Sequence, residues 1–391
     1  MGNPALDLAG GGHASQRIAI VTDTFAPQMN GVARTLNRTA MELRSRGHDV
    51  RVFAPLDPSA TDDSIIAFPS RPFWAYPQLR LSSPAKKRMI AAFNHWRPDI
   101  VHVATPFGIG LSGRAAARAL ALPLVSSYHT SLATYAQFYG LGALTGIGWQ
   151  YLRWFHNGTS ATLCPTKAIA RELVEHGFSS VGLWGRGIDT RQFNPSWRSE
   201  ALRTSWGASA STTVIAYVGR LAAEKGLDVV LHAMKQLAAE RSDVVFVIAG
   251  DGPYEETCRR TAPQRCVFTG RIEGRQLSET YASADLFVFP STTDTFGNVV
   301  QEAMASGLVV VGADVPQTSE VLSGAGVLAT PGNSGSFAQA IRSLLEHRTQ
   351  IDELRRRSLE LSAARGWDAV FDGLEQKYLE TITQHRLARQ R

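Results

Sequence analysis

Two acidic residues, Asp294 and Glu302, lie on either side of a Phe-Gly turn that leads into a predicted helix. The apolar run at 286–290 before them ends in proline and predicts a buried strand. Open α/β sheets bind ligands where such a strand ends and the next helix begins. We expect the backbone N–H groups of 296–298 to face an anion there, and Glu302 to reach the hydroxyls of a ribose. The pattern predicts a sugar-nucleotide site, although a capping Asp294 and a solvated Glu302 remain the simpler alternative.

A second group of charged residues follows the predicted strand 213–218, which runs into Gly219. Arg220 and Lys225 come next, just before a predicted helix. A planar guanidinium and a compact ammonium can together neutralise a diphosphate. The alternative is a solvated ion pair between these cations and Glu224.

The first half of the chain holds two further candidates. Gly31 begins a predicted helix, where backbone can approach a phosphate closely. His129 follows the predicted strand 124–127 and is expected at the carboxyl edge of a sheet. Glycines 108, 110 and 113 match the dinucleotide fingerprint, which needs an acid about 20 residues later. No acid occurs between 119 and 152, so we interpret these glycines as the start of a closely packed helix.

Composition limits the class of protein. A chain of 391 residues, 44% of them hydrophobic, can bury the cores of about two domains. The net charge of +6 favours anionic partners, but the dense basic clusters of a nucleic-acid binder are missing. Three scattered cysteines suit neither a disulfide framework nor a metal site. We see no signal peptide and no run of about 18 apolar residues, and therefore expect a cytoplasmic protein.

Apolar runs alternate with helical stretches along the chain, which is typical of parallel α/β sheets with right-handed crossovers. Two such runs predict two doubly wound Rossmann-like domains facing a central cleft. We place the domains at 16–194 and 195–366, with a polar linker around 193–210. A disordered tail is expected over 1–15, and an amphipathic helix over 367–391 is expected to pack back on the first domain. The expected strands are 17–21, 49–53, 100–103, 124–127, 161–164, 181–184, 213–218, 244–249, 266–268, 286–289, 308–312 and 326–328.

Different short motifs are distributed along nearly the whole chain after residue 16. They are Asn30-Gly31, Tyr128-His129-Thr130, Arg186-Gly187-Ile188-Asp189, Gly219-Arg220, Glu224-Lys225-Gly226, Gly250-Asp251-Gly252-Pro253, Gly270-Arg271-Ile272, Ala284-Asp285 and Asp294-x7-Glu302. Together they resemble family 4 of the retaining glycosyltransferases, whose two-domain architecture is called GT-B. The family signature has two glutamates separated by seven residues, and here Asp294 replaces the first. The Thr-Asp-Thr-Phe-Gly form resembles the branch of GDP-mannose-dependent mannosyltransferases and sulfoquinovosyl-diacylglycerol synthases.

The resemblance implies how a GDP- or UDP-linked sugar would be held. Glu302 would bind the ribose hydroxyls, and the backbone at Ile272 would meet the base. Arg186 stands where the family commonly has asparagine, and we expect its side chain to point into the cleft and contact the donor sugar. The remaining donor-binding groups would complete the anion pocket and are Gly31, Phe296, Gly297 and Asn298.

The resemblance also implies a catalytic set and a mechanism. Arg220 and Lys225 would stabilise the leaving diphosphate, Asp294 would contact hydroxyls of the donor sugar, and His129 would contact the transferred sugar near its reacting face. The expected reaction is a same-side transfer without a metal ion or bound cofactor, in which the leaving phosphate helps to deprotonate the acceptor.

The acceptor is expected to be a lipid or a glycan bound mainly by the first domain. Aromatic and basic residues near its cleft favour a rim that seats on an anionic membrane, on the inner face of the plasma membrane. A core role for the aromatics and a solvated helix face for the charges are the alternative. The residues are Arg71, Phe73, Trp74, Tyr76, Arg80, Lys86, Lys87 and Arg88, and, in a second loop, Tyr135, Phe138, Tyr139, Trp149, Tyr151 and Trp154.

Three rival functions remain open at this point. A nucleotide-sugar epimerase would form product without an acceptor. A phosphorylase would need a lysine that binds pyridoxal phosphate, and none stands out. A sugar-nucleotide sensor would bind without turnover, which the complete set of expected catalytic residues argues against.

Overall fold

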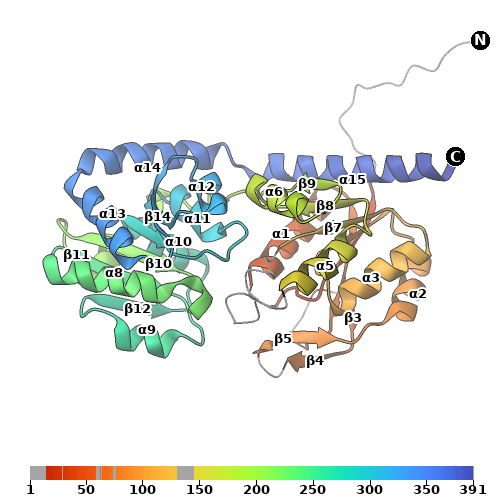
Figure 1. The fold of residues 1–391 in the computed structure, drawn as a ribbon, viewed down its shortest axis with the longest axis horizontal. Coiled ribbons are helices and arrows are strands. Elements are labelled where there is room, and N and C mark those ends of the chain that lie inside the picture. The colour runs from red at the N-terminus through yellow and green to blue at the C-terminus, as the bar shows by residue number, and fades with distance from the viewer. Residues whose placement is uncertain are drawn as a thin grey trace, which may run out of the picture. The chain divides into compact units, whose positions relative to one another are not determined.

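The computed structural model describes residues 15–28, 30–58, 62, 64–73, 76–129 and 145–390 (Figure 1). The chain divides into two compact units, which are described separately. Unit 1 comprises Met1–Ser127, Gly158–Ala161 and Gln376–Arg391. Unit 2 comprises Tyr128–Asn157 and Thr162–Glu375. The tail expected at the N-terminus lies outside the described residues, apart from Ser15.

Seven of the described strands form one sheet in the order β3-β2-β1-β6-β7-β8-β9. The β1 strand pairs with β2 and β6 in parallel, and the other pairs resolved in this sheet are parallel too. The helices that alternate with these strands are apolar on the face that covers a sheet, as the doubly wound pattern requires. The strands are β1 (Arg17–Val21), β2 (Asp49–Pro55), β3 (Ile65–Phe68), β6 (Ile100–Val103), β7 (Leu124–Ser127), β8 (Ala161–Cys164) and β9 (Val181–Leu183). The helices are α1 (Gly31–Ser45), α2 (Lys86–Trp96), α3 (Gly108–Ala119), α5 (Thr145–His156) and α6 (Lys167–Glu175).

Six strands form a second parallel sheet within unit 2, in the order β12-β11-β10-β13-β14-β15. The strands are β10 (Thr213–Val218), β11 (Val244–Ala249), β12 (Cys266–Gly270), β13 (Leu286–Phe289), β14 (Val309–Ala313) and β15 (Gly326–Ala329). The accompanying helices are α7 (Glu200–Ser205), α8 (Leu227–Glu240), α9 (Glu255–Thr261), α10 (Gly274–Ser283), α11 (Asn298–Ala305), α12 (Pro316–Leu322), α13 (Ser334–Glu346) and α14 (Arg348–Ala363), with 3₁₀ turns η2 (Pro195–Trp197) and η3 (Ala223–Lys225). The last helix, α15 (Trp367–Gln390), is divided between the two units.

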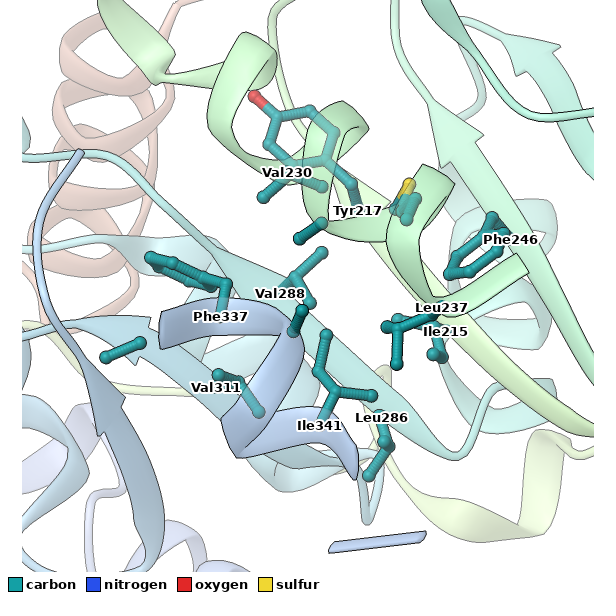
Figure 2. Packing of buried hydrophobic residues seen from close by; sticks show 14 of the residues in the cluster. Ile215, Tyr217, Val230, Leu237, Phe246, Leu286, Val288, Val311, Phe337 and Ile341 are labelled. Carbon is teal, nitrogen blue, oxygen red and sulfur yellow. The ribbon is translucent and has the colours of Figure 1, made fainter. Parts of the chain in front are cut away.

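Both faces of this second sheet are buried, because successive side chains of a strand point to opposite faces. Along β10, Ile215 and Tyr217 belong to one apolar cluster, whereas Val214 and Ala216 belong to the other. Figure 2 shows the first cluster, in which residues of α8 and α13, Phe337 of α13 among them, pack over the strands. The two parallel sheets, each with its alternating helices, confirm the predicted α/β class.

The structure corrects three details of the sequence-based prediction. Phe73 and Tyr76 do not share a long loop: they end β4 (Ser70–Phe73) and begin β5 (Tyr76–Ser82), a two-stranded antiparallel sheet. Prolines at 72 and 77 argue against a central strand, but a two-stranded sheet consists only of edges, where proline is tolerated. The second aromatic group is also not a loop as far as it is described, since Trp149, Tyr151 and Trp154 belong to α5.

The third correction concerns the segment expected to be a polar linker. It forms η2 and α7, and Phe193 and Trp206 are buried in the core of unit 2. Arg203 anchors α7 through hydrogen bonds to the carbonyls of Ser283 and Thr212 and an ion pair with Asp285 at 3.0 Å. One of the serines that suggested a linker, Ser199, instead caps α7 by accepting a hydrogen bond from the backbone N–H of Leu202.

The amphipathic pattern at the end of the chain forms the helix α15. Its residues from Gln376 onward belong to unit 1, where Tyr378 and Ile382 are buried. The Tyr378 hydroxyl lies 2.6 Å from Nδ1 of His102, which is fully buried in β6. Among the helices described, none combines the length and the hydropathy that a membrane span needs.

Candidate functional site

The turn between Asp294 and Glu302 has the predicted geometry. Strand β13 ends at Phe289, and α11 begins at Asn298 with Gly297 as its N-cap residue. Gly297 has φ +79°, a left-handed conformation that favours glycine, and a Cβ there would lie 3.1 Å from the Phe289 ring. The first N–H groups of an α-helix lack partners within the helix, so the start of α11 offers donors to an anion.

Lys225 and Asp294 form an ion pair, which the sequence did not predict. The Lys225 ammonium lies 2.8 Å from both carboxylate oxygens of Asp294. The pair is partly exposed, with 16% of the Lys225 side chain and 28% of the Asp294 side chain accessible. The cation expected to bind a diphosphate and the acid expected to bind a sugar are therefore adjacent, and their charges neutralise each other.

Tyr217 supports the turn that carries Arg220. Its hydroxyl donates to the Arg220 carbonyl at 3.1 Å, and the Arg220 side chain is exposed. Burial and then the nearby Asp294 carboxylate raise the pKa of Tyr217 well above its ordinary value, so the phenol stays protonated and remains a donor. The turn is closely packed as well, since a Cβ on Gly250 would lie 1.9 Å from the Gly219 carbonyl oxygen.

Glu302 is buried rather than solvated. Only 5% of the residue is exposed, and its Oε2 accepts a hydrogen bond from the Tyr281 hydroxyl at 2.9 Å. The Tyr281 ring is fully buried and packs edge-on against Phe193. A carboxylate held in this way, on the first turns of α11, is a fixed acceptor for paired hydroxyl groups. The solvated alternative for Glu302 is therefore wrong.

His129 lies within hydrogen-bonding distance of two segments of unit 2. Its Nδ1 is 2.9 Å from Nη2 of Arg186, and its backbone carbonyl accepts a hydrogen bond from the Thr295 hydroxyl at 2.8 Å. The imidazole packs edge-on against Trp184, with ring centroids 5.5 Å apart. Thr295 follows Asp294 directly, so these contacts connect the histidine to the acidic turn.

Arg186 is itself buried, with 7% of the residue exposed. Its Nη1 donates to the carbonyls of Trp184 at 2.8 Å and Gly185 at 2.9 Å, and its guanidinium lies over the Trp184 ring at 4.6 Å. Burial lowers the pKa of Arg186 to about 10, with the Cys164 thiol acting in the opposite direction. Burial also raises the pKa of Cys164 to about 12, so Arg186 is a cation beside a neutral thiol at neutral pH. The backbone of Arg186 is fixed too, because Gln301 donates to its carbonyl at 3.3 Å.

Comparison with known proteins decides the family. Residues 29–192 match the profile of Glycosyltransferase Family 4, and residues 212–347 match that of Glycosyl transferases group 1. The GDP-mannose-dependent alpha-mannosyltransferase of Mycolicibacterium smegmatis is 34% identical over 382 residues, which cover 95% of this chain and 99% of that protein. The chain belongs to glycosyltransferase family 4.

Two further similarities describe this glycosyltransferase. The sulfoquinovosyl transferase of Arabidopsis thaliana is 33% identical over 319 residues, covering 78% of this chain and 61% of that protein. The solved structure of sucrose-phosphate synthase from Thermosynechococcus elongatus superposes with a TM-score of 0.77 at 18% identity, over 94% of this chain and 100% of that one. That likeness, together with the two Rossmann-like sheets, confirms the predicted GT-B fold.

Most of the predicted site residues of the glycosyltransferase come from unit 2, but not all of them are brought together. Phe296 is half-buried and lines a cavity of about 520 Å³ with Arg186, Trp184 and Gln301. Ile272 is also half-buried and packs against the apolar cluster to which α10 and α11 contribute, and its role at the base stays a prediction. Gly31 belongs to unit 1, where it begins α1 beside the capping residue Asn30, and its role stays a prediction.

Two parts of the predicted site lie beyond what the structure describes. Thr130 of the Tyr-His-Thr motif is outside the described residues, as are Trp74, Tyr135, Phe138 and Tyr139 of the aromatic rim. Within the described residues, no three His, Cys, Asp or Glu side chains gather closely enough to hold a metal ion.

Proposed function

We propose that this glycosyltransferase moves mannose from GDP-mannose to a lipid or glycan acceptor, with retention at the anomeric carbon and without a metal ion or bound cofactor. The observation that carries the donor assignment is the 34% identity, over nearly the full length of both chains, to a GDP-mannose-dependent alpha-mannosyltransferase. The donor-binding chemistry rests on the geometry of Glu302, Lys225, Asp294 and the start of α11.

Each of these groups has a place in the proposed donor complex. Glu302, held by Tyr281, accepts hydrogen bonds from the two ribose hydroxyls. The N–H groups at the start of α11 and the Arg220 and Lys225 side chains neutralise the diphosphate. In this complex Lys225 exchanges Asp294 for the diphosphate, and that carboxylate becomes available to hydroxyls of the mannose.

The proposed chemistry depends on charge that develops during the reaction. As the bond to the leaving diphosphate breaks, positive charge grows at the anomeric carbon and negative charge grows on the phosphate. Preorganised cations and helix N–H groups stabilise that negative charge, and removing one such donor costs about 100- to 1,000-fold in rate in well-studied enzymes. The leaving phosphate oxygen takes the proton of the attacking hydroxyl on the same face of the sugar.

A second donor class is favoured by a specific observation. The Arabidopsis relative, at 33% identity, is a sulfoquinovosyl transferase rather than a mannosyltransferase. Transfer of a UDP-linked sugar to a lipid acceptor, which forms a glycolipid, is therefore the alternative. The residues proposed to bind the phosphates, the ribose and the sugar suit either nucleotide.

Thermal unfolding with GDP or UDP separates the two alternatives. A nucleotide at about 100 times its dissociation constant stabilises the folded protein by about 2.7 kcal/mol, which shifts the melting temperature measurably. We expect GDP to shift it more than UDP and GDP-mannose to support turnover in the presence of EDTA, with an α-linked product by NMR. A larger shift with UDP would replace the mannosyl assignment, and a β-linked product or loss of activity with EDTA would contradict the proposed mechanism.

A further inference from the structure

The contact between Arg186 and His129 restricts the protonation of the histidine. An arginine guanidinium has five N–H donors and no acceptor, so a nitrogen that it approaches at hydrogen-bond distance must supply a lone pair. Nη2 of Arg186 lies 2.9 Å from Nδ1 of His129. The lone pair is therefore at Nδ1, and a neutral imidazole with its lone pair there carries its proton at Nε2.

We propose that Arg186 is a positioning residue that holds His129 as a neutral imidazole with its proton on Nε2. The use of this state in catalysis rests on the proposed function: His129 presents an N–H donor to a hydroxyl or ring oxygen of the donor sugar and cannot act as a base through that nitrogen. Proton transfer from the acceptor is thereby left to the leaving phosphate.

The surroundings hold Arg186 in the required orientation. Its Nη1 is bound by the carbonyls of Trp184 and Gly185, and its guanidinium stacks over the Trp184 ring, so a rotation would break two hydrogen bonds in a buried site. The carbonyl of His129 is fixed separately by Thr295. Backbone carbonyls thus hold the Arg186 side chain, and the Thr295 hydroxyl holds the backbone of His129.

The charged groups around the contact include Arg186 and two carboxylates, of which Glu320 lines the same cavity and accepts hydrogen bonds from the backbone N–H groups of Lys167 and Ala168. The arginine is a cation up to about pH 10. The Asp294 carboxylate, next to Thr295, is engaged by Lys225, and the Cys164 thiol is neutral. Protonation of His129 at Nδ1 would set an N–H against an N–H and place a second positive charge beside Arg186. We therefore expect His129 to titrate below the ordinary histidine range of about pH 6.5.

Long-range ¹H–¹⁵N NMR on the full chain labelled with ¹⁵N-histidine tests the proposal without substrate. The His129 signals are assigned from their loss in His129→Gln. We expect a pyrrole-type Nε2 and a pyridine-type Nδ1 at neutral pH, with a titration midpoint below that of a free histidine. In Arg186→Met the midpoint should rise and the two tautomers should mix. A proton on Nδ1 or an imidazolium at neutral pH in the wild type would overturn the proposal.

Arg365→Met is the matched control, because Arg365 lines the same cavity and is partly buried, with hydrogen bonds to Val321 and Ser323. It removes the same charge and should leave the tautomer and titration of His129 unchanged. An equal change in the two variants would show an effect of fold or net charge and would refute the specific role of Arg186. If Arg186→Met fails to fold, Arg186→Lys serves in its place and should shift the titration in the same direction by a smaller amount.

Kinetics separate this inference from the proposed function. With a working donor, His129→Gln keeps an amide N–H near the Nε2 position and should retain about tenfold more kcat than His129→Asn, whose amide lies near the Nδ1 position. Equal losses in the two variants would refute the donor role of Nε2–H. If no donor is turned over, the proposed function fails, while the NMR result still decides the tautomer.

Discussion

Replacing Tyr281 with phenylalanine tests whether Glu302 is the ribose ligand. The change deletes one oxygen, and the ring keeps its packing against Phe193 and Phe287. What is lost is a hydrogen bond of 2.9 Å to a carboxylate on a residue that is 5% exposed. A hydrogen bond to a charged group contributes about 1.5–3 kcal/mol. If that free energy is lost from ligand binding, the dissociation constant for the preferred nucleoside diphosphate rises by about 10- to 100-fold. If it is lost from folding, urea denaturation shows a lower free energy of unfolding.

Two quantities are measured on the same Tyr281→Phe preparation: nucleotide affinity by isothermal titration calorimetry, and the free energy of unfolding by urea denaturation. Tyr378→Phe is the matched control, since it also deletes a buried hydroxyl, one that lies 2.6 Å from His102 in unit 1. We expect the control to lower the free energy of unfolding and to leave nucleotide affinity within about twofold. Nucleotide affinity in Tyr281→Phe that also stays within about twofold of the wild type, despite lost stability, would refute the reasoning. Tyr281 would then be a structural partner of Glu302 without consequence for the ligand.

Two further predictions concern the Lys225–Asp294 ion pair and the three cysteines. Asp294→Asn should lower kcat with the sugar donor and leave nucleotide affinity equal or higher, because it frees Lys225. Lys225→Met should weaken nucleotide binding instead. Titration calorimetry measures the affinity of both variants, and weaker binding in Asp294→Asn would contradict this prediction. Burial raises the pKa of Cys164 and Cys266 to about 12 and that of Cys258 to about 11, so few thiolates exist at pH 8. Iodoacetamide labelling followed by mass spectrometry should be slow in the folded protein, rise with pH and become fast in urea; rapid labelling at pH 8 would refute it.

Strands with continuous apolar character were predictable from the sequence because their signal is local. Val244–Ala249 is apolar at every position and forms β11 with those bounds, buried on both faces of a parallel sheet. The turn at Gly297 was predictable for a similar reason, since a glycine between an apolar strand and a helical pattern supplies the left-handed conformation that the turn needs. The hairpin β4–β5 was missed because its prolines carry the opposite signal, which applies to central strands but not to edges.

The contacts that define the site were not predictable, because each joins residues far apart in the chain. Tyr281 and Glu302 are 21 residues apart, and Arg186 and His129 are 57 residues apart. Tyr281 falls within an ordinary amphipathic helix, where an aromatic residue indicates core packing and nothing more. The motif containing Arg186 drew attention to that residue, but only the fold shows that the guanidinium meets an imidazole nitrogen.

The pair of Lys225 and Asp294 gives the free site a property that the separate motifs did not suggest. Without an anion beside it, Lys225 would be a largely buried cation, and burying an uncompensated charge costs free energy. Asp294 compensates that charge at 2.8 Å, so the lysine can be held in place before the donor arrives. In the proposed donor complex, Lys225 exchanges the Asp294 carboxylate for a phosphate, and the carboxylate is released beside the sugar. The proposed complex couples phosphate recognition to sugar recognition. A nucleotide without a sugar would free Asp294 but give it no new hydrogen bond, so we expect the sugar itself to add to the affinity.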